Sequence, residues 1–184
     1  GKTTAAMGMG FRAAGHGYRV HMLQFMKGGA DSVDDVRGEY NAIAAMPGFS
    51  YENTGHYGWH NMADGSREED HESEADAALE RTRDLVAAAT DADLDSPFAL
   101  DSDPADGVHM LILDEILYAA DRELVAPEVV CELIDDKPAG LELVLTGSHS
   151  EPRYLDEHAD LISEISKPKH PIDAGQRARS GTEY

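Results

Sequence analysis

The sequence predicts an α/β fold, with a mostly parallel β-sheet and helices on both faces. One observation is a set of three short apolar runs of strand length. The other is that segments with Ala and Leu at helical spacing separate these runs. Strands that alternate with helices pair in parallel, because each helix crosses one face of the sheet before the next strand begins. The strands are expected at 19–25 (RVHMLQF), 108–115 (VHMLILDE) and 141–147 (LELVLTG).

Helices and loops fill the intervals between these strands. The segment 3–14 is rich in Ala and Met and is closed by glycines, which commonly terminate helices. Further helices are predicted at 35–46, 74–90, 127–135 and, as a short one, 153–158. A further strand is predicted at 161–165 (LISEI), and loops at 49–67, at 91–107 and in the tail from Lys167. The chain has no internal repeat, so 1–184 is expected to form a single domain.

The charge of the chain excludes some classes of partner. Its 184 residues carry 36 acidic and 15 basic side chains, a net charge of -21. Such a surface repels nucleic acids and anionic membranes, so neither is expected as a partner. The acids are spread along the whole sequence, which favours a solvated surface adapted to high salt over a single acidic patch for a cationic partner. We therefore expect a halophilic protein.

Cysteine content and hydropathy indicate a cytoplasmic protein. Cys131 is the single cysteine, so no intrachain disulfide can form, and its apolar surroundings predict a buried structural thiol. No apolar run approaches the ~20 residues that a membrane helix needs, and no signal peptide is visible.

The first four residues indicate a phosphate-binding site. Gly1-Lys2-Thr3-Thr4 stands immediately before a predicted helix and matches the second half of the Walker A motif, G-x-x-x-x-G-K-[ST]. In that motif glycine lets backbone amides approach phosphate, the lysine supplies positive charge, and the hydroxyl that corresponds to Thr3 binds Mg²⁺. The first part of the motif is absent from the sequence, and a bare GKTT is also compatible with an ordinary helix start.

A second motif supports the first. Met110–Glu115 is an apolar strand that ends in two acids, as in the Walker B strand whose acid holds Mg²⁺. Acids are also common where any buried strand reaches the surface. The two motifs together, in this order on an alternating α/β pattern, predict a P-loop nucleotide site at Lys2, Thr3, Asp114 and Glu115.

Several segments in order resemble the corrinoid adenosyltransferase family. GKTTAAMGMGFRAAGHGYRV is similar to its P-loop and first helix, QFMKGG to its Q-F-[IL]-K-G strand end, and LILDEI to its L-D-E strand. LVLTG is similar to the family's L-T-G-R strand, and the tail KHPIDAGQRARSGTEY to its C-terminal signature. The resemblance runs through most of the chain.

The resemblance implies a RecA/Rossmann-like P-loop fold and a homodimer. It implies that the 5′-deoxyadenosyl group of ATP is transferred, with Mg²⁺, to the cobalt(I) of a corrinoid in adenosylcobalamin biosynthesis or salvage. Triphosphate is released, and a flavin or flavodoxin-like donor reduces the cobalt. The residues that it implies for ATP are Gly1, Lys2, Thr3, Thr4, Arg12, Asp114 and Glu115, with Lys2, Thr3 and Glu115 catalytic and Thr3 and Glu115 binding Mg²⁺.

The resemblance also implies which residues bind the corrinoid. Gly48-Phe49-Ser50-Tyr51-Glu52 is similar to the family's G-F-x-W-E segment, so Phe49 and Tyr51 are expected to cover the cobalt face. Without the resemblance, two aromatics that pack a loop onto the core would explain the segment nearly as well. The sequence departs from the family at Ser148, where an arginine is usual, and in a longer stretch at 53–76. Trp59 in that stretch could share the aromatic role.

Three further interpretations stay open. His56, His60 and His71 lie in one acid-rich segment, where a solvated insertion is favoured over a metal site. A RecA-like ATPase or small-molecule kinase would share both Walker motifs but would release ADP. A non-catalytic corrinoid- or nucleotide-binding protein would bind without turnover.

Overall fold

The computed structural model describes residues 1–27, 38–55, 68–93, 103–177 and 179–182. Its centre is a sheet of four parallel strands in the order β2-β1-β3-β4. The strands are β1 (Val20–Gln24), β2 (Phe49–Asn53), β3 (Met110–Asp114) and β4 (Glu142–Leu145). The parallel sheet predicted from the alternating pattern is thus confirmed.

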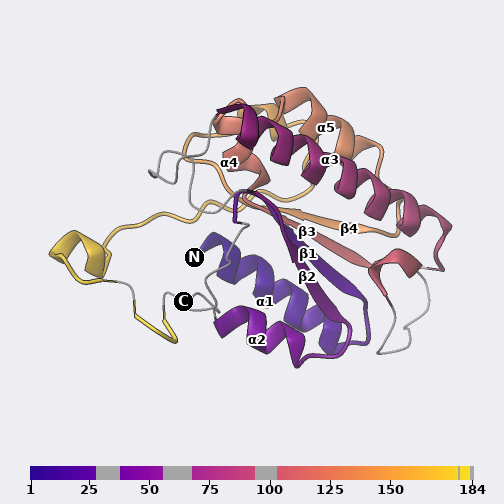
Figure 1. Cartoon of the computed structure of the whole chain (residues 1–184), viewed down its shortest axis with the longest axis horizontal. Helices are drawn as coiled ribbons and strands as arrows, with labels where there is room; N and C mark the ends of the chain where they lie inside the picture. The colour runs from indigo at the N-terminus through magenta and orange to yellow at the C-terminus, as the bar shows by residue number, and fades with distance from the viewer. Residues whose placement is uncertain (28–37, 56–67, 94–102, 178, 183–184) are drawn as a thin grey trace.

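Helices cover both faces of the sheet, as the sequence predicts (Figure 1). On one face lie α1 (Lys2–Gly15) and α2 (Gly38–Ala44), and on the other lie α3 (Glu68–Asp91), α4 (Ile116–Asp121) and α5 (Pro127–Asp135). Three short 3-10 helices complete the described elements: η2 (Pro104–Asp106), η3 (Arg153–Leu155) and η4 (Pro171–Ala174).

The alternation of side chains along β3 explains why both faces need cover. Leu111 and Leu113 belong to the apolar core beneath α3, α4 and α5. Met110 and Ile112 point the other way, into a second core with α1 and α2. Each buried side chain of this size contributes about 1.5–3 kcal/mol when it leaves water. A strand that is apolar on both faces therefore stabilises only a three-layer arrangement.

The predicted loop at 49–67 is wrong over its first five residues, which form β2. Val20 of β1 pairs with Phe49, and Gln24 pairs with Asn53, in a parallel register. Phe49 is only 5% exposed and lies against α1. Apolar and polar side chains alternate along β2, as is typical of a strand. Phe49 and Tyr51 pack toward one face of the sheet, while Ser50 and Glu52 contact polar partners on the other.

The strand predicted at 161–165 is also wrong. The structure assigns no strand to these residues, and Leu161 is 78% exposed. The described part of the tail runs away from the sheet (Figure 1). A short segment rich in Leu and Ile does not make a strand without a neighbouring strand to supply backbone partners, and the described sheet offers none at this segment.

Smaller differences concern boundaries. Helix α3 begins at Glu68, six residues before the predicted start at 74, and α4 was not predicted at all.

Cys131 is partly buried, its thiol donates to the carbonyl of Tyr154 at 3.5 Å, and burial raises the pKa of the thiol. These features fit the structural thiol predicted from the sequence. In the described part of the chain, no helix is long and apolar enough to cross a membrane.

Candidate active site

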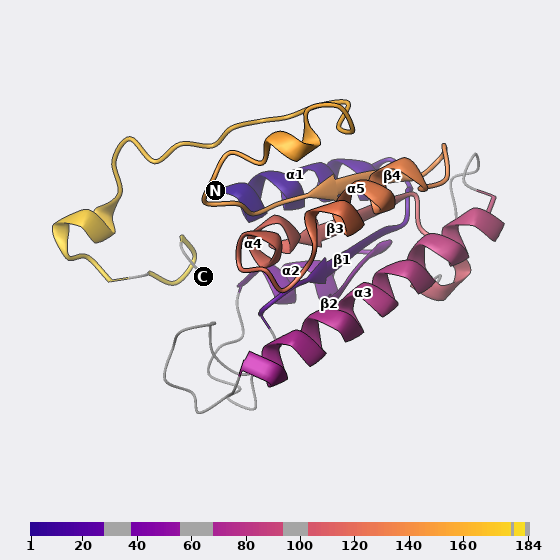
Figure 2. The same ribbon diagram turned by 90° about the horizontal axis from the view of Figure 1, so that it is seen from above.

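The carboxyl ends of β1 and β3 bring the predicted nucleotide-binding residues together. The parallel register places Gln24 beside Asp114, the last residues of their strands. The chain's N-terminus and α4 lie at this same end of the sheet (Figure 2). In open α/β sheets, ligands bind outside the carboxyl ends of the strands. This edge therefore has the geometry expected of a nucleotide site.

Asp114 is the most heavily bonded side chain of this edge. It is fully buried, and its Oδ2 accepts hydrogen bonds from Lys27 Nζ at 2.7 Å and Gln24 Nε2 at 2.8 Å. Its Oδ1 accepts a bond of 2.6 Å from the Thr146 hydroxyl. Burial acts to raise the pKa of Asp114, but the Lys27 charge and the three hydrogen bonds outweigh burial and hold the pKa below its usual value. The side chain is therefore ionised at neutral pH.

Lys27 links the two Walker segments. Besides its ion pair with Asp114, its Nζ lies 3.4 Å from Thr3 Oγ1 and 3.8 Å from Glu115 Oε1. Its side chain is only 8% exposed. Lys27 belongs to the QFMKGG segment but is not among the predicted site residues. A lysine directly after a strand carries no signal by itself, because only the fold brings it to the two motifs.

Glu115 adopts an unusual backbone conformation. Its φ is 65°, in the left-handed region that non-glycine residues seldom occupy. Its backbone N–H donates to Thr146 Oγ1 at 3.0 Å, and helix α4 starts at the next residue. Strain of this kind persists where neighbouring contacts hold it, and it is common at functional sites. The turn leaves the Glu115 carboxylate within reach of the Lys27 ammonium.

The structure thus gathers Thr3, Asp114 and Glu115 around Lys27. Gly1, Lys2 and Thr4 belong to the same helix terminus, where α1 begins at Lys2. Arg12 is not part of the group, because it lies in the last turn of α1. At 1.5 Å per residue, the nine positions from Thr3 to Arg12 place it about 14 Å along the helix. Its role in nucleotide binding stays a prediction.

The predicted corrinoid aromatics occupy different environments. Phe49 is packed against Phe11 of α1, with ring centroids 5.5 Å apart. Tyr51 is partly buried and stacks on Tyr40 at 4.6 Å with an interplanar angle of 8°. The Tyr40 hydroxyl donates to Gln24 Oε1 at 2.7 Å. One stack and one hydrogen bond therefore connect Tyr51 to Gln24 through Tyr40. Gln24 in turn donates a hydrogen bond to Asp114.

Some predicted positions lie outside the described residues. These include Trp59 and the histidines at 56 and 60, so the interpretation of that segment stays a prediction. Within the described residues, no group of three or more His, Cys, Asp or Glu side chains is arranged to hold a metal. Magnesium prefers oxygen ligands and keeps several waters or phosphate oxygens. The Thr3 hydroxyl and the Glu115 carboxylate fit an ion that takes its other ligands from a bound triphosphate and water.

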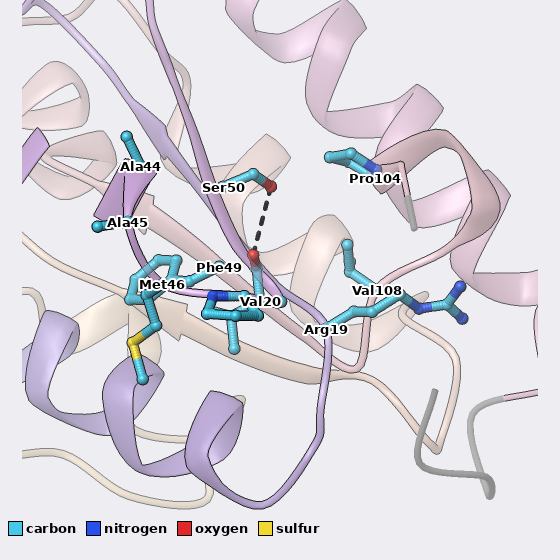
Figure 3. Close-up of a pocket in the computed structure, with 11 residues that line it drawn as sticks. Arg19, Val20, Ala44, Ala45, Met46, Phe49, Ser50, Pro104 and Val108 are labelled. Atoms are coloured by element: carbon cyan, nitrogen blue, oxygen red, sulfur yellow. Dashed lines mark hydrogen bonds between the residues drawn. The ribbon is translucent and has the colours of Figure 1, made fainter. Parts of the chain in front are cut away.

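A pocket of about 500 Å³ lies at the opposite end of the sheet (Figure 3). Arg19, Val20 and Ser50 are among its lining residues, and the Ser50 hydroxyl donates to the carbonyl of Val20 at 3.4 Å. Val20 begins β1 whereas Gln24 ends it, so the pocket and the acidic edge are about 13 Å apart along the strand. The pocket is therefore separate from the predicted nucleotide site.

A second polar cluster lies under α3. His21 is buried, its Nδ1 is 2.8 Å from Ser50 Oγ, and its Nε2 is 3.5 Å from Glu52 Oε1. Arg81 of α3 donates to Glu52 through its Nε at 2.9 Å. Burial lowers the pKa of His21 to about 4, even though the Glu52 charge acts to raise it. The imidazole is therefore neutral at pH 7, and the cluster attaches β2 to α3.

Comparison with known proteins agrees with this geometry. The family model described as ATP:corrinoid adenosyltransferase BtuR/CobO/CobP matches residues 1–184. A corrinoid adenosyltransferase of Pseudomonas aeruginosa is 30% identical over 184 residues, covering 100% of this chain and 78% of the relative. Those of Escherichia coli and Salmonella typhimurium are 29% and 31% identical over 189 residues, covering 100% of this chain and 80% of each relative.

Neither the match nor these relatives favour the ATPase or kinase alternative. Because the family model spans every residue and the Walker segments converge in space, the chain belongs to the ATP:corrinoid adenosyltransferase family and is an enzyme that transfers the adenosyl group of ATP to a corrinoid.

Proposed function

We propose that the carboxyl edge of the sheet binds the triphosphate of Mg-ATP and leaves C5′ of the ribose exposed to the corrinoid. The observation that carries this proposal is the convergence of Thr3, Asp114 and Glu115 at the N-terminus of α1. A helix N-terminus presents free backbone N–H groups and a partial positive charge, which together favour phosphate. Lys2, the first residue of α1, adds a full charge at the same end.

The chemistry needs no nucleophile from the protein. The electron pair of cobalt(I) attacks C5′, a cobalt–carbon bond forms, and the C5′–O bond breaks. The bonding electrons leave with the triphosphate, which gains negative charge in the transition state. The protein therefore acts by holding C5′ in line with cobalt and by stabilising charge on the leaving triphosphate. In this proposal Lys2 and the amide groups at the start of α1 provide that stabilisation.

Magnesium would be held by Thr3 and Glu115. When bound, it would neutralise part of the phosphate charge without any transfer of protons. Asp114 already accepts hydrogen bonds from Lys27, Gln24 and Thr146, which occupy three of the about four acceptor positions of a carboxylate. We therefore assign the metal to Glu115 and a positioning role to Asp114.

On the corrinoid side, we assign the contact to Tyr51 and an anchoring role to Phe49. The Phe49 ring is enclosed by α1, and a Cβ added at Gly10 would lie 2.7 Å from it, so the helix leaves that ring no space to move inward. Tyr51 is partly exposed and stacks on Tyr40.

We further propose a homodimer, a flavin or flavodoxin-like electron donor and a cytoplasmic location. The net charge of -21 also leads us to propose that the protein requires high salt.

Calorimetric titration with ATP and with adenosine tests the phosphate site. Lys2→Ala is expected to weaken ATP binding at least tenfold and to leave adenosine binding unchanged, because only ATP carries phosphates. Arg153→Ala is the matched control, since it removes one positive charge from a residue that is exposed and paired with Glu151. Equal ATP affinities for the wild type and Lys2→Ala would refute the assignment of the phosphate site.

A further inference from the structure

We propose that Lys27 is a second phosphate-binding lysine, positioned by Asp114 to contact the triphosphate of ATP. This inference rests on the nucleotide site proposed above and adds a residue to which that proposal gives no role. Lys27 follows β1, far from both Walker segments in the sequence, and reaches them only in the folded chain.

The Lys27 ammonium group lies beside the start of α1. Lys27 Nζ lies 3.4 Å from Thr3 Oγ1, and Thr3 is the second residue of α1. It therefore stands within contact distance of the hydroxyl that is expected beside the phosphates. A triphosphate bound at this helix terminus would pass next to the ammonium.

Hydrogen bonds fix the Lys27 ammonium group in place. Asp114 accepts hydrogen bonds from three donors, and Gln24, one of these donors, is held in turn by the Tyr40 hydroxyl. The Lys27 backbone N–H also donates to the carbonyl of Thr54 at 2.9 Å. A lysine held at both its backbone and its charged end loses little conformational entropy when a ligand arrives, which favours binding.

The charge and the donor capacity of Lys27 also suit a phosphate. An ammonium group has three N–H donors, and the hydrogen bonds to Asp114 and Thr3 use two of them. Asp114 and Glu115 bring two negative charges to the edge that must accept a polyanion. Lys27, at 2.7 Å and 3.8 Å from these two carboxylates, offsets that repulsion and has a donor left for a phosphate oxygen.

The competing explanation is that Lys27 serves only as the counter-ion of a buried carboxylate. Replacing Lys27 alone cannot separate the two roles, because it leaves Asp114 buried and unpaired, which destabilises the fold. The double variant Lys27→Met with Asp114→Asn removes both charges together. Asp114→Asn alone is its matched control, since it removes the same carboxylate and keeps the ammonium.

The test measures binding of ATP and of adenosine by calorimetry at fixed KCl with EDTA present, so that no metal contributes. Thermal melting of each variant verifies that it is folded. We expect the double variant to bind ATP at least tenfold more weakly than Asp114→Asn, with equal affinity for adenosine. If the methionine variant melts too early, Lys27→Gln with Asp114→Asn keeps a hydrogen bond between the two positions and gives the same comparison.

The possible outcomes separate the two proposals. If Lys2→Ala weakens ATP binding but the double variant binds ATP as well as Asp114→Asn does, Lys27 is only a counter-ion and this inference is wrong. If ATP binds no better than adenosine to the wild type, the phosphate site itself is misplaced and the inference is overturned with it.

Discussion

Replacing Thr146 with valine tests how the acidic edge of the sheet is held in place. The Thr146 hydroxyl donates to Asp114 Oδ1 at 2.6 Å and accepts from the Glu115 backbone N–H at 3.0 Å. Thr146 is buried, so water cannot easily replace either bond. Valine has nearly the same shape as threonine. The substitution therefore removes the two hydrogen bonds without opening a cavity.

The expected cost follows from these two bonds. A hydrogen bond to a charged group contributes about 1.5–3 kcal/mol, and a buried N–H left without a partner costs about 1–3 kcal/mol. Thr146→Val should therefore destabilise the protein by about 2.5–6 kcal/mol. Thr146→Ser keeps the hydroxyl and loses one methyl group, for about 1 kcal/mol. The difference between these variants isolates the hydrogen bonds from the packing.

Urea denaturation of both variants at a fixed KCl concentration measures this difference, and ATP titration measures its consequence. Without the bond to Thr146, the Glu115 backbone is free to leave its φ of 65°, so affinity for Mg-ATP should fall in the valine variant and persist in the serine variant. Equal free energies of unfolding for valine and serine would refute the role assigned to Thr146.

Three more predictions concern stability. Because the pKa of His21 falls from 6.5 to about 4 on folding, the unfolded chain binds the extra proton, and stability should decline by ~3 kcal/mol as the pH drops from 6.5 to 4. Denaturation at several pH values measures this slope, and a His21→Asn variant with an equally steep slope would contradict it. Tyr40→Phe strands the acceptor of buried Gln24, and we expect a loss of about 1–3 kcal/mol; an unchanged melting temperature would show that this bond contributes nothing. Gly147→Ala places a Cβ 2.5 Å from the backbone nitrogen of Tyr118 at a φ of 122°, so a loss of about 2–5 kcal/mol is expected, and a variant as stable as the wild type in urea would argue against this turn.

The elements that the sequence predicted correctly are those with strong apolar patterns. The strand at 108–115 is apolar on both faces, and the helix at 127–135 has apolar residues at helical spacing, so local pattern and tertiary packing agree. Strand β2 was missed because three of its five residues are polar, and two of these, Ser50 and Glu52, face partners on β1 and α3 that lie far away in the sequence. Helix α4 was missed because it has only six residues.

For the candidate site, the sequence predicted which motifs meet but not how they are held together. Thr3, Asp114 and Glu115 follow from motif chemistry. Lys27 and Gln24 could not be predicted, because their roles depend on the register that sets β1 beside β3. The segment 161–165 shows the opposite error, since its Leu and Ile residues resemble a strand while the described sheet offers it no partner. The sequence pattern therefore predicts the secondary structure of a residue, whereas the pairing of the strands determines which residues become neighbours.

The most direct test of the account is the transfer reaction itself. The protein is incubated with Mg-ATP and chemically reduced cob(I)alamin or cob(I)inamide in molar KCl, and the light-sensitive spectrum of the cobalt–carbon product is followed while chromatography identifies the phosphate product. The account predicts adenosylated corrinoid together with an equal amount of triphosphate. Release of ADP without any corrinoid product would contradict it and would indicate an ordinary P-loop ATPase or kinase.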